Sequence, residues 1–228
     1  MDENMHKTTA TVFGSTGLVG KKIATFLEED PDFKRVFLPH RREANFSTKG
    51  IHQLINYDKL EEYDSLFQVD VIFIALGTTI KKAGSQEAFK KVDLEYPKKI
   101  ALWAKKYQVK TVVLISSVGA SANSSNFYLR TKGQAEKELQ NILGDNLYIV
   151  RPSMLLGKRE EFRLSEEIGK VFIRLFSFLL LGKLKKYKGI YDEELAKAMI
   201  YLSKVNPQQK IYHSDELKEL SKNYSKLK

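Results

Sequence analysis

The chain has 228 residues, 43% of them apolar and 29% charged, a composition typical of a globular α/β protein with a sizeable core. It has no cysteine, which excludes disulfides and cysteine-ligated metals, and its four histidines lack metal-ligand spacing, so we expect no metal site. The net charge is +10, but the lysines mostly form separate pairs along the chain, so we expect solvated faces and no specific nucleic-acid partner.

The N-terminal residues MDENMHKTT lack a basic start followed by an apolar stretch, so we expect no signal peptide and a cytoplasmic protein. The next stretch, TATVFGSTGLVG from Thr9 to Gly20, predicts a buried strand, a tight turn and the start of a helix. Gly14 permits the turn, Gly17 lets a ligand approach the main chain, and Gly20 lets the helix pack on its strand.

The start of this helix presents free N–H groups and a positive dipole end, which suit the pyrophosphate of a dinucleotide. A turn that is merely tight is the alternative interpretation. The residues expected to contact the cofactor here are Gly14, Ser15, Thr16, Gly17, Leu18 and Val19.

Two arginines follow the second predicted strand, Arg35 to Leu38. In an NAD-binding protein of this kind, an acidic residue at this place would hold the ribose 2′-hydroxyl. Arg41 and Arg42 offer planar, permanently charged groups that pair with a phosphate, so they favour NADP over NAD. The alternative is that both side chains only make the surface soluble.

Strands and helices then alternate along the chain, which predicts an α/β fold with a doubly wound, Rossmann-like parallel sheet. The later elements are strands at 51–55, 70–76, 111–115 and 147–150, with helices at 85–107 and 128–143. The alternation stops over 157–189, and a helix near 192–203, a short strand around 210–213 and a lysine-rich tail follow. We expect one domain, 1–228, in which 153–228 contributes a small substrate-covering segment.

Further cofactor contacts are expected where the fourth and sixth strands end. Small residues let the chain pass close to a ribose or phosphate. Asp58 would meet the adenine amino group, or it would begin a helix at Lys59 to Ser65 as its N-cap. The remaining expected contacts are Ala75, Leu76, Gly77, Thr78 and Pro152.

The catalytic candidates lie one strand–helix unit apart. Ser116 and Ser117 end the fifth strand, where open α/β sheets place their ligands. Tyr128 and Lys132 are four residues apart and share one helical face. A neighbouring ammonium favours the phenolate, which suits a tyrosine to acid–base chemistry, and a serine hydroxyl orients a substrate carbonyl.

Several stretches together resemble one known family: GSTGLVG, HRR, ALGTT with KKAG, KVDLEY, ISSVGA, SSNFYLRTKG and RPSMLLG. On these stretches, from about 8 to 157, the chain resembles the atypical short-chain dehydrogenase/reductases, and among them the NADP-binding oxidoreductases of the Tat-interactive-protein type. The resemblance implies that Tyr128 is the general acid/base, that Lys132 binds the nicotinamide ribose and assists the tyrosine, and that Ser117 orients the substrate. Better-known members often supply an asparagine to a proton relay near the position of Asp93.

An apolar run from Val171 to Leu181 leads into a lysine-rich stretch that ends at Lys188. It is shorter than the roughly 20 residues that a membrane-spanning helix needs. We favour a helix that lines the substrate pocket or a homodimer interface, since Arg174 interrupts the apolar face. The alternative is weak membrane-surface contact through 171–188, with the lysines over anionic lipid.

Three functions remain open at this point. The first is an NADP-dependent reductase or dehydrogenase acting on a small carbonyl or alcohol through Ser117, Tyr128 and Lys132. The second is a regulatory protein whose binding of NADP(H) changes a partner interaction. The third is a nucleotide-sugar epimerase or dehydratase, which would normally carry a larger C-terminal substrate domain.

Overall fold

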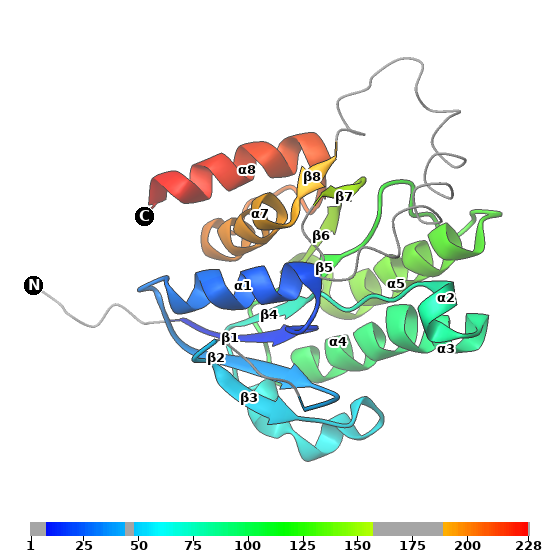
Figure 1. Cartoon of the computed structure of the whole chain (residues 1–228), viewed down its shortest axis with the longest axis horizontal. Coiled ribbons are helices and arrows are strands. Elements are labelled where there is room, and N and C mark those ends of the chain that lie inside the picture. Colours follow the sequence, from blue (N-terminus) through cyan, green and yellow to red (C-terminus); the bar gives the residue numbers. More distant parts are fainter. Residues whose placement is uncertain (1–7, 44–47, 157–188, 228) are drawn as a thin grey trace, which may run out of the picture.

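The computed structural model describes residues 8–43, 48–156 and 189–227 (Figure 1). Its centre is a seven-stranded sheet in which all neighbouring strands run parallel, in the order β3-β2-β1-β4-β5-β6-β9. This is the order of a Rossmann-type sheet, in which the chain winds outward from β1 in both directions. The strands are β1 Thr8–Phe13, β2 Phe33–His40, β3 Ile51–Leu54, β4 Val71–Ile74, β5 Thr111–Ile115, β6 Leu147–Arg151 and β9 Ile211–His213.

The central strands read as apolar runs because helices cover both faces of the sheet. All four residues of β4 are buried, and its register on β1 pairs Ala10 with Val71 and Phe13 with Ile74. The expected doubly wound α/β fold is therefore confirmed, down to the strands predicted from these runs.

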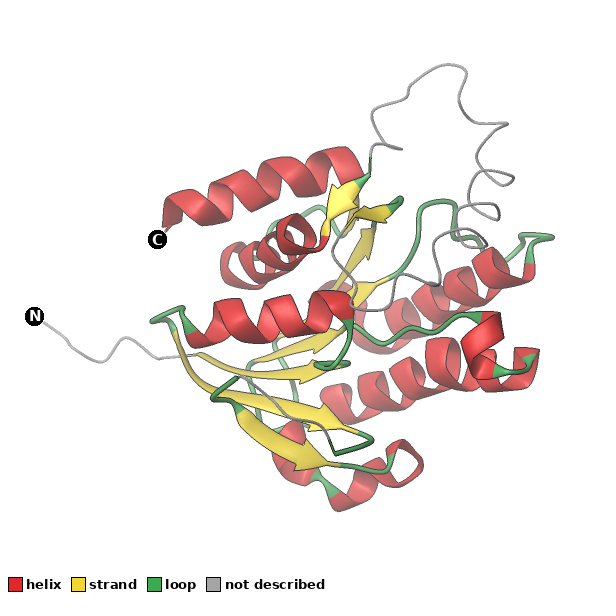
Figure 2. Ribbon diagram, viewed as in Figure 1, coloured by secondary structure: helices red, strands yellow, loops and turns green. Residues whose placement is uncertain are grey.

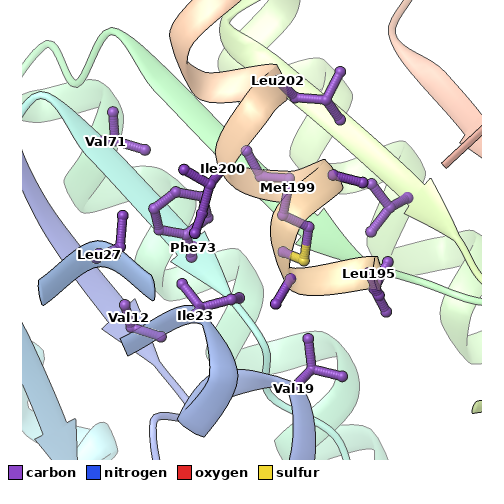
Figure 3. Packing of buried hydrophobic residues seen from close by; sticks show 14 of the residues in the cluster. Val12, Val19, Ile23, Leu27, Val71, Phe73, Leu195, Met199, Ile200 and Leu202 are labelled. Carbon is purple, nitrogen blue, oxygen red and sulfur yellow. The ribbon is translucent and has the colours of Figure 1, made fainter. Parts of the chain in front are cut away.

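One layer of helices consists of α1 Leu18–Glu28, α7 Asp192–Val205 and α8 Ser214–Leu227, and the other includes α4 Tyr96–Lys106 and α5 Phe127–Leu143 (Figure 2). Each layer encloses its own cluster of buried apolar side chains against the sheet. In the first cluster, Ile23 of α1 and Met199 of α7 face Phe73 of β4 (Figure 3).

The C-terminal part contains a helix that we did not expect. The lysine-rich tail is an amphipathic helix, α8, whose Leu217, Ser221 and Tyr224 are buried at spacings of four and three. Helix α7 packs against α1 and β9 extends the sheet, so most of 190–227 completes the fold's core layer. Only the short strand β8 (Ile190–Tyr191), paired with β7 (Leu155–Leu156), belongs to a separate small sheet.

The predicted helix at 85–107 contains an unexpected irregularity. The chain forms α2 Ile80–Ala83 and α3 Gln86–Lys90, then a π-helical turn over Lys91–Glu95 that leads into α4. A π turn accommodates an extra residue, and such turns are frequent at functional sites. This one contains Asp93, which is buried.

The predicted helix at 59–65 is instead a pair of short 3₁₀ helices, Tyr57–Glu62 and Asp64–Leu66. Among the described residues, no helix is long and apolar enough to cross a membrane. The segment 171–188, for which we expected a pocket, dimer or membrane role, lies outside the described residues.

Candidate cofactor and catalytic site

The glycine-rich turn is as tight as the sequence predicts. Gly14 has φ +91°, and a Cβ added there would lie 2.5 Å from the carbonyl oxygen of Ala75. A Cβ on Gly20 would lie 2.1 Å from the carbonyl oxygen of Gly14. Both positions therefore require glycine, because a side chain would separate the turn from β4 or from α1.

The first turn of α1 is open to an anion. Gly17 is its N-cap residue, and no side chain caps the helix. The first N–H groups of a helix have no partner within the helix, so they attract negative charge from outside. Thr16 and Gly17 are exposed beside them, whereas Ser15 is buried and its hydroxyl donates to the carbonyl of Pro39. This main-chain cradle fits the pyrophosphate of a dinucleotide.

Arg41 and Arg42 are exposed directly after β2, next to the glycine turn. Between them and the turn lies Tyr57, a buried residue that the sequence did not single out. Burial raises the pKa of Tyr57, against the opposing effects of the Arg41 charge and of a hydrogen bond with the Gly14 main chain. Its ring stacks on Tyr96 with the centroids 4.9 Å apart. The sequence did not predict this stacked pair of tyrosines, because no motif marks it.

The loop after β4 crosses the same end of the sheet. Ala75, Leu76 and Thr78 are half-buried, and Gly77 is exposed. The Ala75 N–H continues the sheet by donating to Phe13, and the Thr78 N–H donates to Asp93 Oδ2 at 3.0 Å. The loop is thus held both to β1 and to the π turn.

The serine pair extends β5 at its carboxyl end. The Ser116 N–H donates to the carbonyl of Val150, and both hydroxyls are buried. Ser117 Oγ donates to the carbonyl of Val118 at 3.3 Å, whereas Ser116 Oγ has no hydrogen-bond partner among the described residues. Sequence reasoning chose Ser117, and the structure brings both serines to the predicted edge.

Tyr128 lies in the first turn of α5, and several local bonds fix that turn. Asn126 caps the helix by accepting from the Leu129 N–H, and Arg130 donates to the carbonyls of Ser124 and Ser125. The half-buried Tyr128 ring packs at 5.7 Å from the ring of Phe89 (α3).

Lys132, one turn along α5 from Tyr128, is a buried cation. Its Nζ lies 2.7 Å from Asp93 Oδ1, with side-chain exposures of 7% and 1%, and 3.5 Å from the Ile115 carbonyl at the end of β5. Burial alone lowers the pKa of Lys132, but attraction from Asp93, Tyr128 and Glu136 outweighs it, so the pKa is raised. Lys132 therefore carries its charge next to the serine pair.

A second, partly buried ion pair involves the next turn of α5. Arg151, the last residue of β6, donates from Nε to Glu136 Oε1 at 2.9 Å, and a second bond joins the same two side chains. The next residue, Pro152, is buried, and its carbonyl accepts from the Val118 N–H after the serine pair. Pro152 therefore contributes to the same edge of the sheet through its main chain.

Asp58 is not the cap of the helix that follows it, and its contact with an adenine stays a prediction. The N-cap of the 3₁₀ helix is Asn56, whose side chain accepts from the Asp58 N–H. The Asp58 carboxylate is half-exposed and bonds Lys91 Nζ at 2.8 Å. The hydrogen bond from Lys91, with a smaller effect of Lys99, lowers the pKa of Asp58 below its ordinary value. Its partners are therefore lysines of the neighbouring helical stretch.

The carboxyl edge of this sheet thus combines a glycine-rich anion cradle with a serine pair, a tyrosine and a buried lysine. No group of three or more metal-ligating side chains occurs within the described residues. The fold and this edge define a protein with a Rossmann-like α/β fold and a ligand site expected at the carboxyl ends of its strands.

The chain belongs to the HIM1 family, whose model matches residues 33–184. Protein FMP52, mitochondrial, of Meyerozyma guilliermondii is 34% identical over 94% of this chain and 96% of its own. Protein HTATIP2 of Rattus norvegicus is 34% identical over 75% and 72% of the two chains. The resemblance to the Tat-interactive-protein type is therefore confirmed.

Solved structures agree on the fold. The ADP-L-glycero-D-manno-heptose-6-epimerase of Helicobacter pylori has a TM-score of 0.69 and 16% identity, covering 99% of this chain and 84% of its own. The UDP-N-acetylglucosamine 4-epimerase of Methanobrevibacter ruminantium M1 has a TM-score of 0.69 and 15% identity, covering 94% and 81%.

Our expectation of a cytoplasmic protein is wrong. FMP52 proteins of several yeasts, including those of Meyerozyma guilliermondii and Debaryomyces hansenii, carry the designation mitochondrial. An N-terminal composition without a secretory pattern does not separate the cytoplasm from an organelle.

Proposed function

We propose that the protein is an NADP-dependent oxidoreductase of the carbonyl reductase or alcohol dehydrogenase type. The observation that carries this proposal is the buried Lys132 ammonium, one helical turn from Tyr128 and 3.5 Å from the Ile115 carbonyl. A cation is costly to bury, so its retention at the edge where such sheets bind ligands favours a catalytic role.

The roles of the residues follow from their positions. The main chain of the glycine turn and the start of α1 would hold the pyrophosphate, and Lys132 would bind the nicotinamide ribose. NADPH, when bound there, would supply the hydride for reduction of a substrate carbonyl. Tyr128 then gives its hydroxyl proton to the carbonyl oxygen, and Lys132 stabilises the resulting phenolate. Ser117 turns its hydroxyl from the Val118 carbonyl to donate to the same substrate oxygen.

The proposed preference for NADP rests on Arg41 and Arg42 and on the missing acidic residue. Replacing both arginines by alanine should weaken NADPH binding by about 1.5–3 kcal/mol, because charge-assisted bonds are lost, and should leave NADH binding nearly unchanged. Isothermal titration of both cofactors measures this. Arg35→Ala, an exposed arginine near the start of the same strand, is the matched control. Tighter binding of NADH than of NADPH by the unaltered protein would contradict the preference.

The catalytic proposal is tested with NADPH and a panel of aldehydes and ketones. Tyr128→Phe keeps the ring but removes the proton donor, so turnover should fall by a factor of about 10²–10⁴ while NADPH still binds. Tyr107→Phe, at the C-terminal end of α4, is the matched control. Ser117→Ala should lower turnover far more than Ser116→Ala, and the reverse order would transfer the role to Ser116.

A second candidate is a nucleotide-sugar epimerase or dehydratase, favoured by the fold that the chain shares with the two epimerases. These enzymes return the hydride to the sugar, so no net oxidation of the cofactor accompanies turnover. Incubation with UDP- and ADP-sugars, followed by chromatography of the sugars, distinguishes this activity. Detection of a rearranged sugar without consumption of NADPH would favour the epimerase or dehydratase over the reductase.

We propose a mitochondrial location on the strength of the designation of the FMP52 relatives. Fractionation of cells that express the full chain, with immunodetection in mitochondrial and cytosolic fractions, tests this. Recovery in the cytosolic fraction alone would contradict it.

A further inference from the structure

Asp93 touches two separate parts of the proposed cofactor site. Its Oδ1 pairs with Lys132 Nζ on α5 at 2.7 Å, and its Oδ2 accepts the Thr78 N–H of the loop after β4 at 3.0 Å. The carboxylate is nearly inaccessible, with 1% of the side chain exposed, and it lies in the π turn Lys91–Glu95. The buried Asp93 side chain therefore connects the loop after β4 with Lys132.

We propose that Asp93 is a positioning residue that keeps Lys132 charged and in place and couples it to the loop that seats the cofactor. The proposal rests on the proposed function, since it assigns Lys132 to the ribose. A long lysine side chain has many rotamers, so a fixed counter-charge is needed to hold its Nζ at one point. The carboxylate belongs to a π-helical turn, an irregularity that is frequent at functional sites.

The surroundings of Lys132 make Asp93 its principal partner. On α5 itself, Tyr128 and Glu136 lie one turn away on either side, and from β5 only the Ile115 carbonyl reaches Nζ, at 3.5 Å. Glu136 is already bonded twice to Arg151. Removing the charge of Asp93 therefore leaves the ammonium buried without a committed counter-charge, a situation that favours the neutral amine.

The first test uses ¹⁵N-lysine NMR of the full chain without cofactor, with the Lys132 signal identified by its loss in Lys132→Arg. In Asp93→Asn, which keeps an oxygen for the Thr78 N–H, Lys132 should lose its proton about one pH unit or more lower than in the unaltered protein. Asp30→Asn is the control, because Asp30 is equally buried and also pairs with a lysine at 2.7 Å. An identical Lys132 titration in both variants would overturn the proposal.

A second measurement covers the case in which Asp93→Asn fails to fold. Lys132→Met should shift the amide signal of Thr78 in the unliganded protein, because both groups bind the same carboxylate. Lys204→Met, which removes the lysine from the Asp30 pair, should leave Thr78 unchanged. An unmoved Thr78 amide in Lys132→Met would show that the two segments are not coupled through Asp93.

NADPH titration separates this proposal from the proposed function. In Asp93→Asn, the affinity for NADPH should fall at a lower pH than in the unaltered protein, because Lys132 loses its proton earlier as the pH rises. Equal pH dependence in the two proteins would refute the coupling to cofactor seating. Absence of NADPH binding in the unaltered protein would defeat the proposed function, while the two NMR measurements would still decide the role of Asp93.

Discussion

Gly133, the residue after Lys132, offers a test in which two physical effects predict opposite signs. In the middle of a helix, alanine is normally better than glycine by about 0.5–1 kcal/mol, so propensity predicts that Gly133→Ala stabilises the protein. The structure predicts the reverse. A Cβ at this position would lie 2.2 Å from the carbonyl carbon of Ser121 and 2.3 Å from the main-chain nitrogen of Ala122.

These are backbone atoms, so no side-chain rotation relieves the overlap. Helix α5 and the 121–122 loop would have to separate by about 1.2 Å to reach an ordinary contact of 3.4 Å. Overpacking of this kind costs about 1–3 kcal/mol or more, which exceeds the gain in propensity. We expect a net loss of at least about 1 kcal/mol, which for a chain of this size lowers Tm by about 2–4 °C per kcal/mol.

Thermal and urea denaturation of Gly133→Ala measure this loss. Lys137→Ala, an exposed position one turn further along α5, is the control for helix propensity and should leave stability within about 0.5 kcal/mol. The same shift displaces Lys132, and a misplacement of about 1 Å costs up to about 10²-fold in turnover. A Gly133→Ala variant that is as stable as the unaltered protein would refute the reasoning.

Three other predictions concern parts of the fold outside the site. Burial by itself raises the pKa of Asp70, but a hydrogen bond from Lys110 and bonds from strand β1 outweigh it and hold this pKa below its ordinary 3.8. The advantage of the unaltered protein over Asp70→Asn should therefore be complete above about pH 4 and disappear as pH falls through the lowered pKa, a trend that urea denaturation at several pH values would follow. Met199→Ala removes a fully buried side chain and should cost about 2–5 kcal/mol in chemical denaturation, and a loss below about 1 kcal/mol would mean that the α7 layer is not tightly packed. Tyr224→Phe removes a 2.9 Å bond to the buried carboxylate of Asp30 and should cost about 1.5–3 kcal/mol by the same measurement, whereas unchanged stability would show that this bond is not formed.

The sequence predicted the fold well because its signals are local. An apolar run such as the one at 71–74 has one plausible environment, a parallel strand covered on both sides, and the three glycines limit the first turn to one geometry. The order of the strands then follows from the right-handed crossovers that such units require. The short 3₁₀ helices escaped prediction because their hydrogen bonds involve only a few residues and leave no periodic pattern.

The site was predictable only where a motif fixes the spacing. Tyr128 and Lys132 are separated by one helical turn, so their common face follows from the sequence. The partners that set their environment come from distant segments. Asp93 reaches Lys132 from 39 positions away, and Arg151 reaches Glu136 across a strand boundary, so no local pattern announces either pair. The sequence drew attention to Asp93 through the family resemblance, in which a nearby asparagine often serves a proton relay, but not to its pairing with Lys132.

Buried charges occur at both ends of this sheet, and their arrangement differs. At the amino edge, Asp30 binds Lys204 and Tyr224, and these contacts join helices α7 and α8 to the turn before β2. That network ties together elements that pack side by side, which is sufficient reason for its presence. At the carboxyl edge, the pair of Asp93 and Lys132 joins elements that the core already holds together. Buried ion pairs are often no more stabilising than apolar side chains of the same volume, so stability does not explain the second network. The proposed chemistry of that edge, which requires a charged Lys132, would explain it.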